Sequence, residues 1–204
     1  MVQIAPSMLA ADFLHLEKDV ELVNNHADIF HLDIMDGTFV PNISYGFPIV
    51  EAIAKIATKP LDAHLMIVHP EKYVDRFAKV GVQMLSFHLN AVDNAGQVLA
   101  QIRAAGMSPG LAINPDIPVE KLFPYLDQCD YVVLMSVFAG FGGQKFIEAT
   151  YNRVETLKAE IERQGVECLI QVDGGVSAAN SAKLAELGAD ILVAGSAVFK
   201  AEDP

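Results

Sequence analysis

The stretch IFHLDIMDGTFVPN, residues 29–42, contains the pattern on which the predicted fold depends. It begins as an apolar run in which His31, Asp33 and Met35 occupy alternate positions, and in a β-strand these three side chains point to one face. An Asp-Gly turn follows at residues 36–37. A buried imidazole beside a buried carboxylate is unfavourable unless the two are paired, bind a metal or take part in chemistry. The stretch therefore predicts a strand that carries function.

Outward from this stretch, short apolar runs alternate with amphipathic segments along the whole chain. Eight buried strands are predicted at residues 4–9, 29–35, 61–67, 84–89, 108–113, 131–137, 168–172 and 191–194. Seven helices are predicted at residues 13–26, 48–57, 70–81, 95–105, 118–126, 149–163 and 177–187. Apolar strands joined by crossover helices indicate a parallel sheet, and eight of them favour a closed (β/α)₈ TIM barrel, one domain over residues 1–204.

A doubly wound open sheet is the alternative architecture. It is disfavoured because the segment after the first strand, Ser7–Asp12, contains no glycine and so lacks the usual dinucleotide fingerprint.

Composition excludes several classes of partner. The chain has 204 residues, 52% of them hydrophobic, which is enough for one large core. A formal charge of −12 argues against a nucleic-acid partner. The sequence shows neither a secretory signal nor an apolar run near the ~20 residues that span a bilayer. Cys129 and Cys168 are expected to be free thiols. We therefore expect a cytoplasmic protein without a membrane partner.

Four polar residues fall late in predicted strands, where a parallel barrel places its active site. They are His31 and Asp33 on the second strand, His64 on the third and Asp173 at the end of the seventh. A lone histidine in a strand is more often a hydrogen-bonded core residue, so it is the convergence of four groups that favours ligation. Two imidazoles and two carboxylates predict one divalent metal ion per chain. Nitrogen ligands favour zinc, and the carboxylates also accommodate iron, manganese or cobalt.

The other histidines and two further aspartates receive structural interpretations. His88, near another strand end, is expected to back the site or the core rather than to ligate. Asp36 is interpreted as a turn residue and Asp62 as a strand-entry residue. Surface positions are expected for His15, His26 and His69.

Glycine-rich segments follow the last three predicted strands. They are Gly140-Phe141-Gly142-Gly143, Gly174-Gly175 and Gly195-Ser196. Glycines allow a close backbone approach and can aim successive N–H groups at an anion. Phosphate binding around the last strands recurs in these barrels, and backbone dipoles would let an acidic protein hold a phosphate. The alternative is that these glycines only form tight loops.

Together, motifs along essentially the whole chain resemble those of ribulose-phosphate 3-epimerases. In chain order, the segments that carry the resemblance are PSMLAADF (6–13), residues 31–42, DAHLM (62–66), GFGGQ (140–144), VDGGV (172–176) and GSA (195–197).

The resemblance implies a metal-dependent, homo-oligomeric enzyme of the ribulose-phosphate-binding barrel type. It would interconvert D-ribulose 5-phosphate and D-xylulose 5-phosphate in the pentose phosphate pathway. The matching motifs make Asp33 and Asp173 the catalytic acid/base pair, and both would hold the metal with His31 and His64. Met35, Met66 and Met135 would line the site. Substrate contacts would come from Ser7, His64, Gly140, Phe141, Gly142, Gly143, Asp173, Gly174, Gly175, Gly195 and Ser196.

The residues also suit this chemistry without the family name. Inversion of a carbon beside a ketone removes its proton from one face and delivers a proton to the other. Asp33 and Asp173, on strands expected at opposite walls of the barrel, provide two such groups.

The chain departs from the family pattern in two places. Ala139 stands where the family usually has proline before the first loop glycine, which leaves the closure of this loop over substrate open. The family continues into an eighth helix, whereas the sequence ends at Pro204. We therefore expect the eighth helix to be absent or truncated, with a neighbouring subunit as an alternative cover.

Three other functions remain as alternatives. A 3-epimerase of D-allulose 6-phosphate has similar motifs and a substrate one carbon longer. A metal-independent decarboxylase or aldolase would use a lysine, and no predicted strand has one in its interior. A non-catalytic phosphosugar-binding barrel would have little reason to retain both Asp33 and Asp173.

Overall fold

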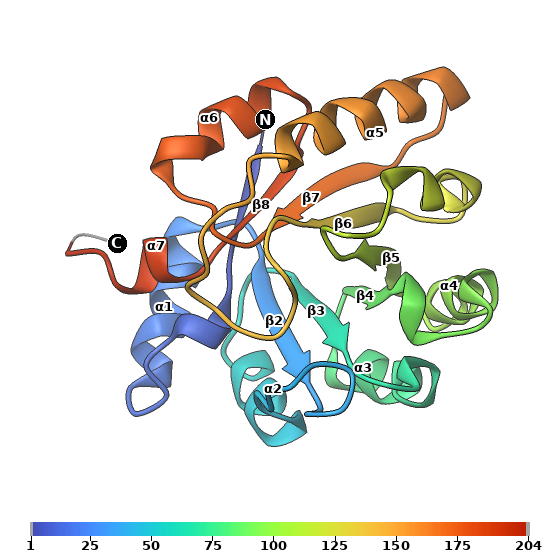
Figure 1. The fold of residues 1–204 in the computed structure, drawn as a ribbon. Helices are drawn as coiled ribbons and strands as arrows, with labels where there is room; N and C mark the ends of the chain where they lie inside the picture. The colour runs from blue at the N-terminus through green and yellow to red at the C-terminus, as the bar shows by residue number, and fades with distance from the viewer. Residues whose placement is uncertain (1, 203–204) are drawn as a thin grey trace.

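The computed structural model describes residues 2–202 and contains eight parallel strands arranged as a nearly closed barrel (Figure 1). The predicted barrel fold is thereby confirmed. Neighbouring strands follow the order β1-β8-β7-β6-β5-β4-β3-β2. The strands are β1 (Gln3–Pro6), β2 (Phe30–Met35), β3 (Leu61–Met66), β4 (Met84–His88), β5 (Ser108–Ile113), β6 (Tyr131–Met135), β7 (Leu169–Asp173) and β8 (Ile191–Ala194).

β1 and β2 approach one another to complete the ring. The backbone N–H groups of Asp28 and Ile29 both donate to the carbonyl of Ile4, and an isolated parallel bridge joins Ser7 to His31. β1 and β2 therefore lie side by side, and two predicted site residues, Ser7 and His31, are paired there.

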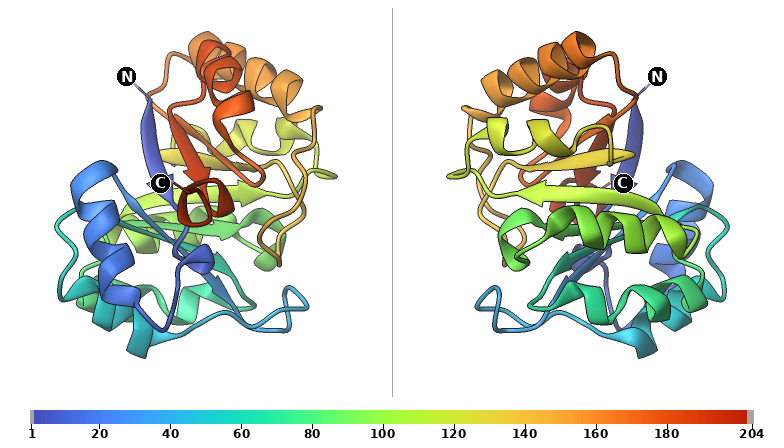
Figure 2. Two further views of the ribbon diagram at one scale, coloured as in Figure 1. Left: turned by 90° about the vertical axis from the view of Figure 1, so that its left-hand side faces the viewer. Right: turned by 90° about the vertical axis from the view of Figure 1, so that its right-hand side faces the viewer.

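The helices cover the outside of the barrel (Figures 1 and 2). They are α1 (Leu16–His26), α2 (Phe47–Ala54), α3 (Val74–Val80), α4 (Ala95–Ala104), α5 (Thr150–Gln164), α6 (Ala178–Glu186) and the short α7 (Ser196–Phe199) after β8. Gly81 and Gly165 end α3 and α5 with positive φ angles of 96° and 67°, the left-handed conformation that favours glycine after a helix. Within residues 2–202, no helix has the length and apolar content needed to cross a membrane.

One predicted element differs from the structure in type, and several differ in where they begin or end. The helix predicted at residues 118–126 is instead two 3₁₀ turns, η4 (Val119–Lys121) and η5 (Phe123–Tyr125). Pro124 lies inside this segment, and proline both lacks a backbone donor and disfavours helical geometry at the residue before it.

Two of the differences in element ends involve 3₁₀ turns. β1 ends at Pro6, and the 3₁₀ turn η1 (Met8–Ala10) follows because the Ser7 side chain accepts a hydrogen bond from the N–H of Leu9. The helix predicted from residue 70 begins with the 3₁₀ turn η2 (Pro70–Lys72), and α3 itself begins at Val74.

Candidate metal centre and active site

The four predicted metal ligands converge inside the barrel from β2, β3 and β7. One ligand atom from each of His31, Asp33, His64 and Asp173 lies within 4.8 Å of all the others. The Nε2 atom of His31 lies 3.4 Å from Asp33 Oδ1 and 3.7 Å from Asp173 Oδ2. The Nδ1 atom of His64 lies 3.6 Å and 3.4 Å from the same two oxygens. All four residues are buried.

This donor set fits a divalent cation. The two nitrogens that face the carboxylates, His31 Nε2 and His64 Nδ1, are buried and have no hydrogen-bond partner among residues 2–202. Buried polar atoms normally find partners, so two orphaned atoms facing one point indicate a missing ligand. Tetrahedral zinc with bonds of about 2.0–2.2 Å would separate its ligand atoms by about 3.3–3.6 Å. Three of the four nitrogen-oxygen distances lie within that range, and the fourth, between His31 Nε2 and Asp173 Oδ2, is 3.7 Å.

The four groups also change one another's ionisation. Burial alone would lower the pKa of His31, but the charges of Asp33 and Asp62 outweigh burial and raise this pKa well above its ordinary value. Burial alone would raise the pKa of Asp33, yet His31 and His64 hold it below the ordinary range. The pKa of Asp173 is lowered despite burial and despite its neighbour Asp33, because both histidines favour its charged form. A bound cation would replace the histidine protons in this arrangement.

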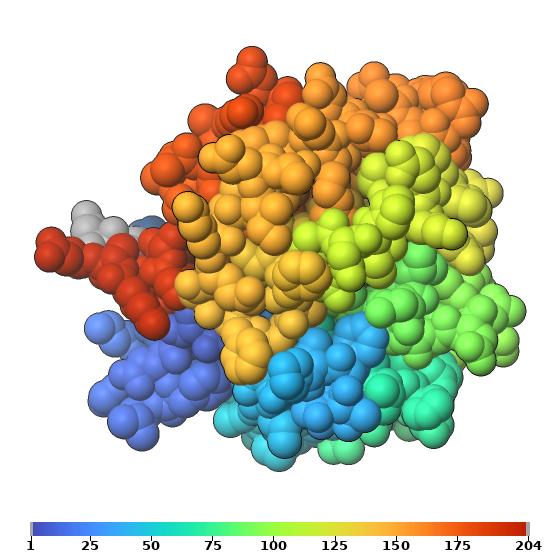
Figure 3. Space-filling model, in the orientation of Figure 1, coloured from blue at the N-terminus to red at the C-terminus, as the bar shows by residue number. Residues whose placement is uncertain are grey.

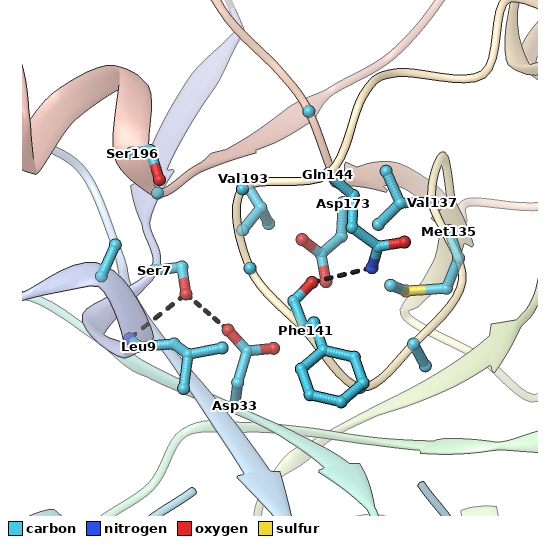
Figure 4. Close-up of a pocket in the computed structure, with 18 of the residues that line it drawn as sticks. Ser7, Leu9, Asp33, Met135, Val137, Phe141, Gln144, Asp173, Val193 and Ser196 are labelled. Atoms are coloured by element: carbon cyan, nitrogen blue, oxygen red, sulfur yellow. Dashed lines mark hydrogen bonds between the residues drawn. The ribbon is translucent and has the colours of Figure 1, made fainter. Parts of the chain in front are cut away.

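A cavity of about 480 Å³ opens above the cluster, and Asp33 and Asp173 both reach into it (Figure 4). Ser7 donates from its hydroxyl to Asp33 Oδ2 at 2.5 Å, which orients this carboxylate. His31 and His64 lie beneath the cavity and are fully buried. The structure brings the other predicted site residues to the cavity lining: Ser7, Asp33, Met35, Met66, Met135, Gly140, Phe141, Gly142, Gly143, Asp173, Gly174, Gly175, Gly195 and Ser196.

The backbone at Gly174 and Gly175 packs too tightly for any side chain. A Cβ atom at Gly174 would lie 2.4 Å from Val137 Cγ2, and one at Gly175 would lie 2.6 Å from the backbone nitrogen of Phe146. Both glycines have positive φ angles. The segment after β7 can therefore lie against the segment after β6 only with glycine at these positions.

The loop between β6 and α5 lies across the mouth of the cavity and against the segment that follows β2 (Figure 3). The side-chain amide of Asn42 donates to the carbonyl of Gly140 at 2.9 Å. Within the loop, the Gln144 amide donates to the carbonyls of Phe138 at 2.7 Å and Phe141 at 2.8 Å. The first contact ties the loop to the segment after β2, and the other two hold the loop's own conformation.

Ala139 has a specific partner in this loop. Its backbone N–H donates to Asn114 Oδ1 at 3.1 Å. Arg153 of α5 in turn donates to the carbonyls of Asn114 at 3.0 Å and Met135 at 2.9 Å. Proline has no N–H group, so alanine at position 139 permits an attachment of the loop to the end of β5 that proline would remove.

Sequence reasoning missed three polar residues that line the cavity and one that lies beneath it. Asn42, Gln144 and Lys200 line the cavity, and among residues 2–202 Lys200 is the only basic residue that does so. Asp62 is the second residue of β3, as its interpretation as a strand-entry residue predicts. Its hydrogen bond with His31 Nδ1, at 2.8 Å, was not predicted. The available signal was the alternation in β3, which places Asp62 on the same face as His64, two residues later.

The remaining histidine and aspartate predictions agree with the structure. His88 backs the site: its Nε2 lies 2.9 Å from His64 Nε2, and burial followed by the charge of His64 lowers the pKa of His88 well below its ordinary value. Asp36 is a turn residue whose carboxylate accepts from the N–H groups of Thr38 and Phe39. Exposed positions are found for His15, His26 and His69.

Comparisons with solved structures support the fold assignment. A mutant tryptophan synthase α-subunit from Pyrococcus furiosus matches with a TM-score of 0.75 and 18% identity, over 97% of this chain and 89% of that chain. At such low identity the match shows the barrel fold alone.

Comparisons with known sequences show the family. The model of the ribulose-phosphate 3 epimerase family matches residues 3–199. Ribulose-phosphate 3-epimerase of Synechocystis sp. is 44% identical, over 98% of this chain and 88% of the relative. That of Bacillus subtilis is 42% identical, over 100% of this chain and 94% of the relative. The cluster of two histidines and two aspartates beneath a glycine-lined cavity thus lies in a chain that belongs to the ribulose-phosphate 3-epimerase family, a family of carbohydrate isomerases.

Proposed function

We propose that this chain interconverts D-ribulose 5-phosphate and D-xylulose 5-phosphate by inverting C3, as a step of the pentose phosphate pathway. The observation that carries the proposal is the pair of carboxylates, Asp33 and Asp173, that enter one cavity from β2 and β7. These strands are separated by β1 and β8 on one side of the barrel and by four strands on the other. The two carboxylates can therefore approach a bound sugar from different sides.

In the proposed reaction, one carboxylate removes the C3 proton and the other delivers a proton to the opposite face. The intermediate is an enediolate, whose negative charge lies on the oxygens at C2 and C3. Each aspartate acts as base in one direction and as acid in the other, so the same pair serves both epimers. Ser7 holds Asp33 through Oδ2, which leaves Oδ1 facing the histidines.

His31, Asp33, His64 and Asp173 would hold one divalent cation, and we propose zinc because two of the four ligands are imidazole nitrogens. When bound, the cation supplies Lewis-acid stabilisation of the developing negative charge, an effect usually worth several kcal/mol. Met35, Met66 and Met135 contribute an apolar wall that limits water beside the reacting carbon.

The substrate phosphate is proposed to bind at the glycine end of the cavity, defined as residues 140–143, 174–175 and 195–196. Backbone N–H groups there can donate to phosphate oxygens without a change in the net charge of the protein. Lys200 adds a positive charge at the same end. This places the phosphate away from the buried carboxylates, which would repel it.

The test is solvent deuterium exchange at C3, followed by NMR. The purified chain is incubated in deuterium oxide with ribulose 5-phosphate or with allulose 6-phosphate, each with added divalent metal and with chelator. We expect exchange and epimerisation of ribulose 5-phosphate with metal, and loss of both with chelator.

Each other outcome identifies an alternative. Exchange with allulose 6-phosphate alone would assign the longer substrate. Exchange that survives chelation would remove the metal from the reaction. Exchange with neither sugar, despite measurable binding of both, would indicate a non-catalytic phosphosugar-binding barrel.

A further inference from the structure

Directly beneath the metal cluster, a layer of polar side chains crosses the barrel interior. Asp62 Oδ2 lies 2.8 Å from His31 Nδ1 and accepts from the Gln171 amide at 2.8 Å. Asp62 Oδ1 accepts from the Tyr131 hydroxyl at 2.7 Å. His31, Asp62 and Gln171 have no exposed surface, and Tyr131 is 1% exposed. Each group comes from a different strand, namely β2, β3, β7 and β6.

A glycine on a fifth strand makes room for this layer. Gly110 of β5 lies beside Tyr131, and a Cβ atom at Gly110 would lie 2.4 Å from the ring carbon that bears the hydroxyl. Only glycine therefore allows the Tyr131 ring to lie where its hydroxyl reaches Asp62. The room that Gly110 leaves for the Tyr131 ring, together with hydrogen bonds at both carboxylate oxygens, indicates that the Asp62 side chain is held in one position.

The hydrogen bonds also determine the state of His31. A carboxylate only accepts, so the bond to Asp62 requires the proton of neutral His31 to be on Nδ1. The lone pair is then on Nε2, which is the orphaned nitrogen facing Asp33 and Asp173. The Gln171 amide lies 3.1 Å from His31 Nδ1 and donates to the same carboxylate oxygen. His31 thus presents its free nitrogen to the cluster.

The second histidine is supported differently. His64 Nε2 faces His88 Nε2 at 2.9 Å, and the two rings stack with centroids 5.0 Å apart. A neutral imidazole is a weaker acceptor than a carboxylate, because hydrogen bonds to ionised groups are about twice as strong as neutral ones. Of the two histidines, His31 is the one with a charged, fully bonded partner.

We propose that Asp62 is a positioning residue for the metal centre: it fixes the tautomer and ring orientation of His31, and Tyr131 and Gln171 hold Asp62 in place. The proposal rests on the metal site of the proposed function. It adds that residues other than the four ligands orient one of those ligands. In metal sites, partners of this kind alter affinity about 10–100-fold.

The test measures cobalt(II) affinity of the full-length chain by competition with a chelator, which needs no catalysis. We expect Asp62→Asn to weaken binding about 10–100-fold and Tyr131→Phe to weaken it about fivefold. The matched control is Asp190→Asn, which also alters a carboxylate bonded inside the fold, to the N–H of Ile170, and which lies outside the cavity. It should stay within about twofold of the wild-type chain.

Nitrogen-15 NMR of the zinc-loaded chain gives a second readout. In the wild-type chain we expect His31 to be protonated on Nδ1, and in Asp62→Asn we expect this signal to broaden or to shift toward the other tautomer. Wild-type affinity and an unchanged tautomer in Asp62→Asn would overturn the proposal. If Asp62→Asn does not fold, unchanged affinity in Tyr131→Phe overturns it equally. A wild-type chain that binds no divalent cation would remove the proposed metal site and this inference together.

Discussion

The two ends of the cavity are built in different ways. The metal end consists of four side chains on strands, all buried, and each bonded or opposed by another buried polar group. The glycine end consists of backbone from three loops, beside exposed side chains such as Phe141, which is 52% exposed. Proton transfer needs fixed side chains, whereas a phosphate can be held by backbone donors. In the proposed function, the reacting groups thus lie on the strands of the barrel and the phosphate-binding groups on the loops that follow them.

The largest effect should follow removal of one carboxylate at the metal end. Asp173→Asn keeps the shape of the side chain but removes the acid/base function. We expect kcat for ribulose 5-phosphate to fall about 10²–10⁴-fold, and KM to change much less because the glycine end is untouched. Steady-state kinetics with saturating metal measure both values.

The control for this substitution is Asp93→Asn, an exposed carboxylate in the loop after β4 that does not line the cavity. It should leave kcat within about twofold. A raised KM with an unchanged kcat in Asp173→Asn would contradict the separation of proton transfer at the metal end from phosphate binding at the glycine end.

A second prediction concerns protons at the metal end. Because Asp33 and Asp62 raise the pKa of His31 against the effect of burial, a proton occupies this imidazole up to a higher pH than usual. A cation must displace that proton, so apparent metal affinity should rise with pH until the raised pKa is passed and then level off. Each displaced proton makes this slope about tenfold per pH unit.

Calorimetric titration with cobalt(II) or manganese(II), in buffers of different ionisation enthalpy, measures both the affinity and the released protons. No titrating side chain is proposed to hold the anion at the glycine end, so binding of sulfate, whose charge does not change over this pH range, serves as the control. Metal affinity that does not change between about pH 5.5 and 7.5 would contradict the charge arrangement.

The metal end also shows how far sequence patterns reach. Alternation within one strand identified His31 and Asp33 as site residues. His64 and Asp173 were added because a parallel barrel has its active site at the carboxyl ends of its strands. Both signals depend only on where a residue stands within a strand. Alternation in β3 places Asp62 on the face of His64, but the hydrogen bonds that hold its carboxylate come from partners 69 and 109 residues away in the chain. Such pairings are set by the tertiary register of β3, β6 and β7, which no local pattern encodes.

The error in predicted secondary structure at residues 118–126 arises because an apolar spacing typical of a helix occurs together with a proline. The apolar spacing of residues 118–126 predicts a helix, but Pro124 interrupts it and two 3₁₀ turns form instead. The glycine segments were found from composition, yet Asn42, Gln144 and Lys200 were not. Polar residues in loops carry no period, so nothing in the sequence separates those that face a cavity from those that face solvent.

A third prediction separates backbone strain from site geometry at the glycine end. Gly175→Ala adds a Cβ atom that would lie 2.6 Å from the backbone nitrogen of Phe146, at a φ angle of 63°. We expect unfolding free energy to fall by about 1 kcal/mol from the left-handed backbone and by a further 1–3 kcal/mol, roughly, from overpacking. KM should rise because the loop must move.

The control is Gly81→Ala at the end of α3, where φ is 96° and no atom of the described residues 2–202 lies within 4 Å of the added atom. This variant should lose only about 1 kcal/mol and keep its KM. Denaturant unfolding and steady-state kinetics on both variants make the comparison. Equal losses of stability in the two would show that the close approach of the loops does not constrain position 175.

The smallest effect should come from Lys200, because its charge is exposed and added to backbone donors that remain in place. We expect Lys200→Ala to raise KM for ribulose 5-phosphate a few-fold, roughly, with kcat unchanged, since a solvated charge contributes little in water. The difference between variant and wild type should shrink as salt is added, because screening removes the same attraction. Lys79→Ala on α3, also exposed and away from the cavity, should change neither constant. A large fall in kcat for Lys200→Ala would mean that the glycine end takes part in the reaction, and the separation between binding and chemistry would then fail.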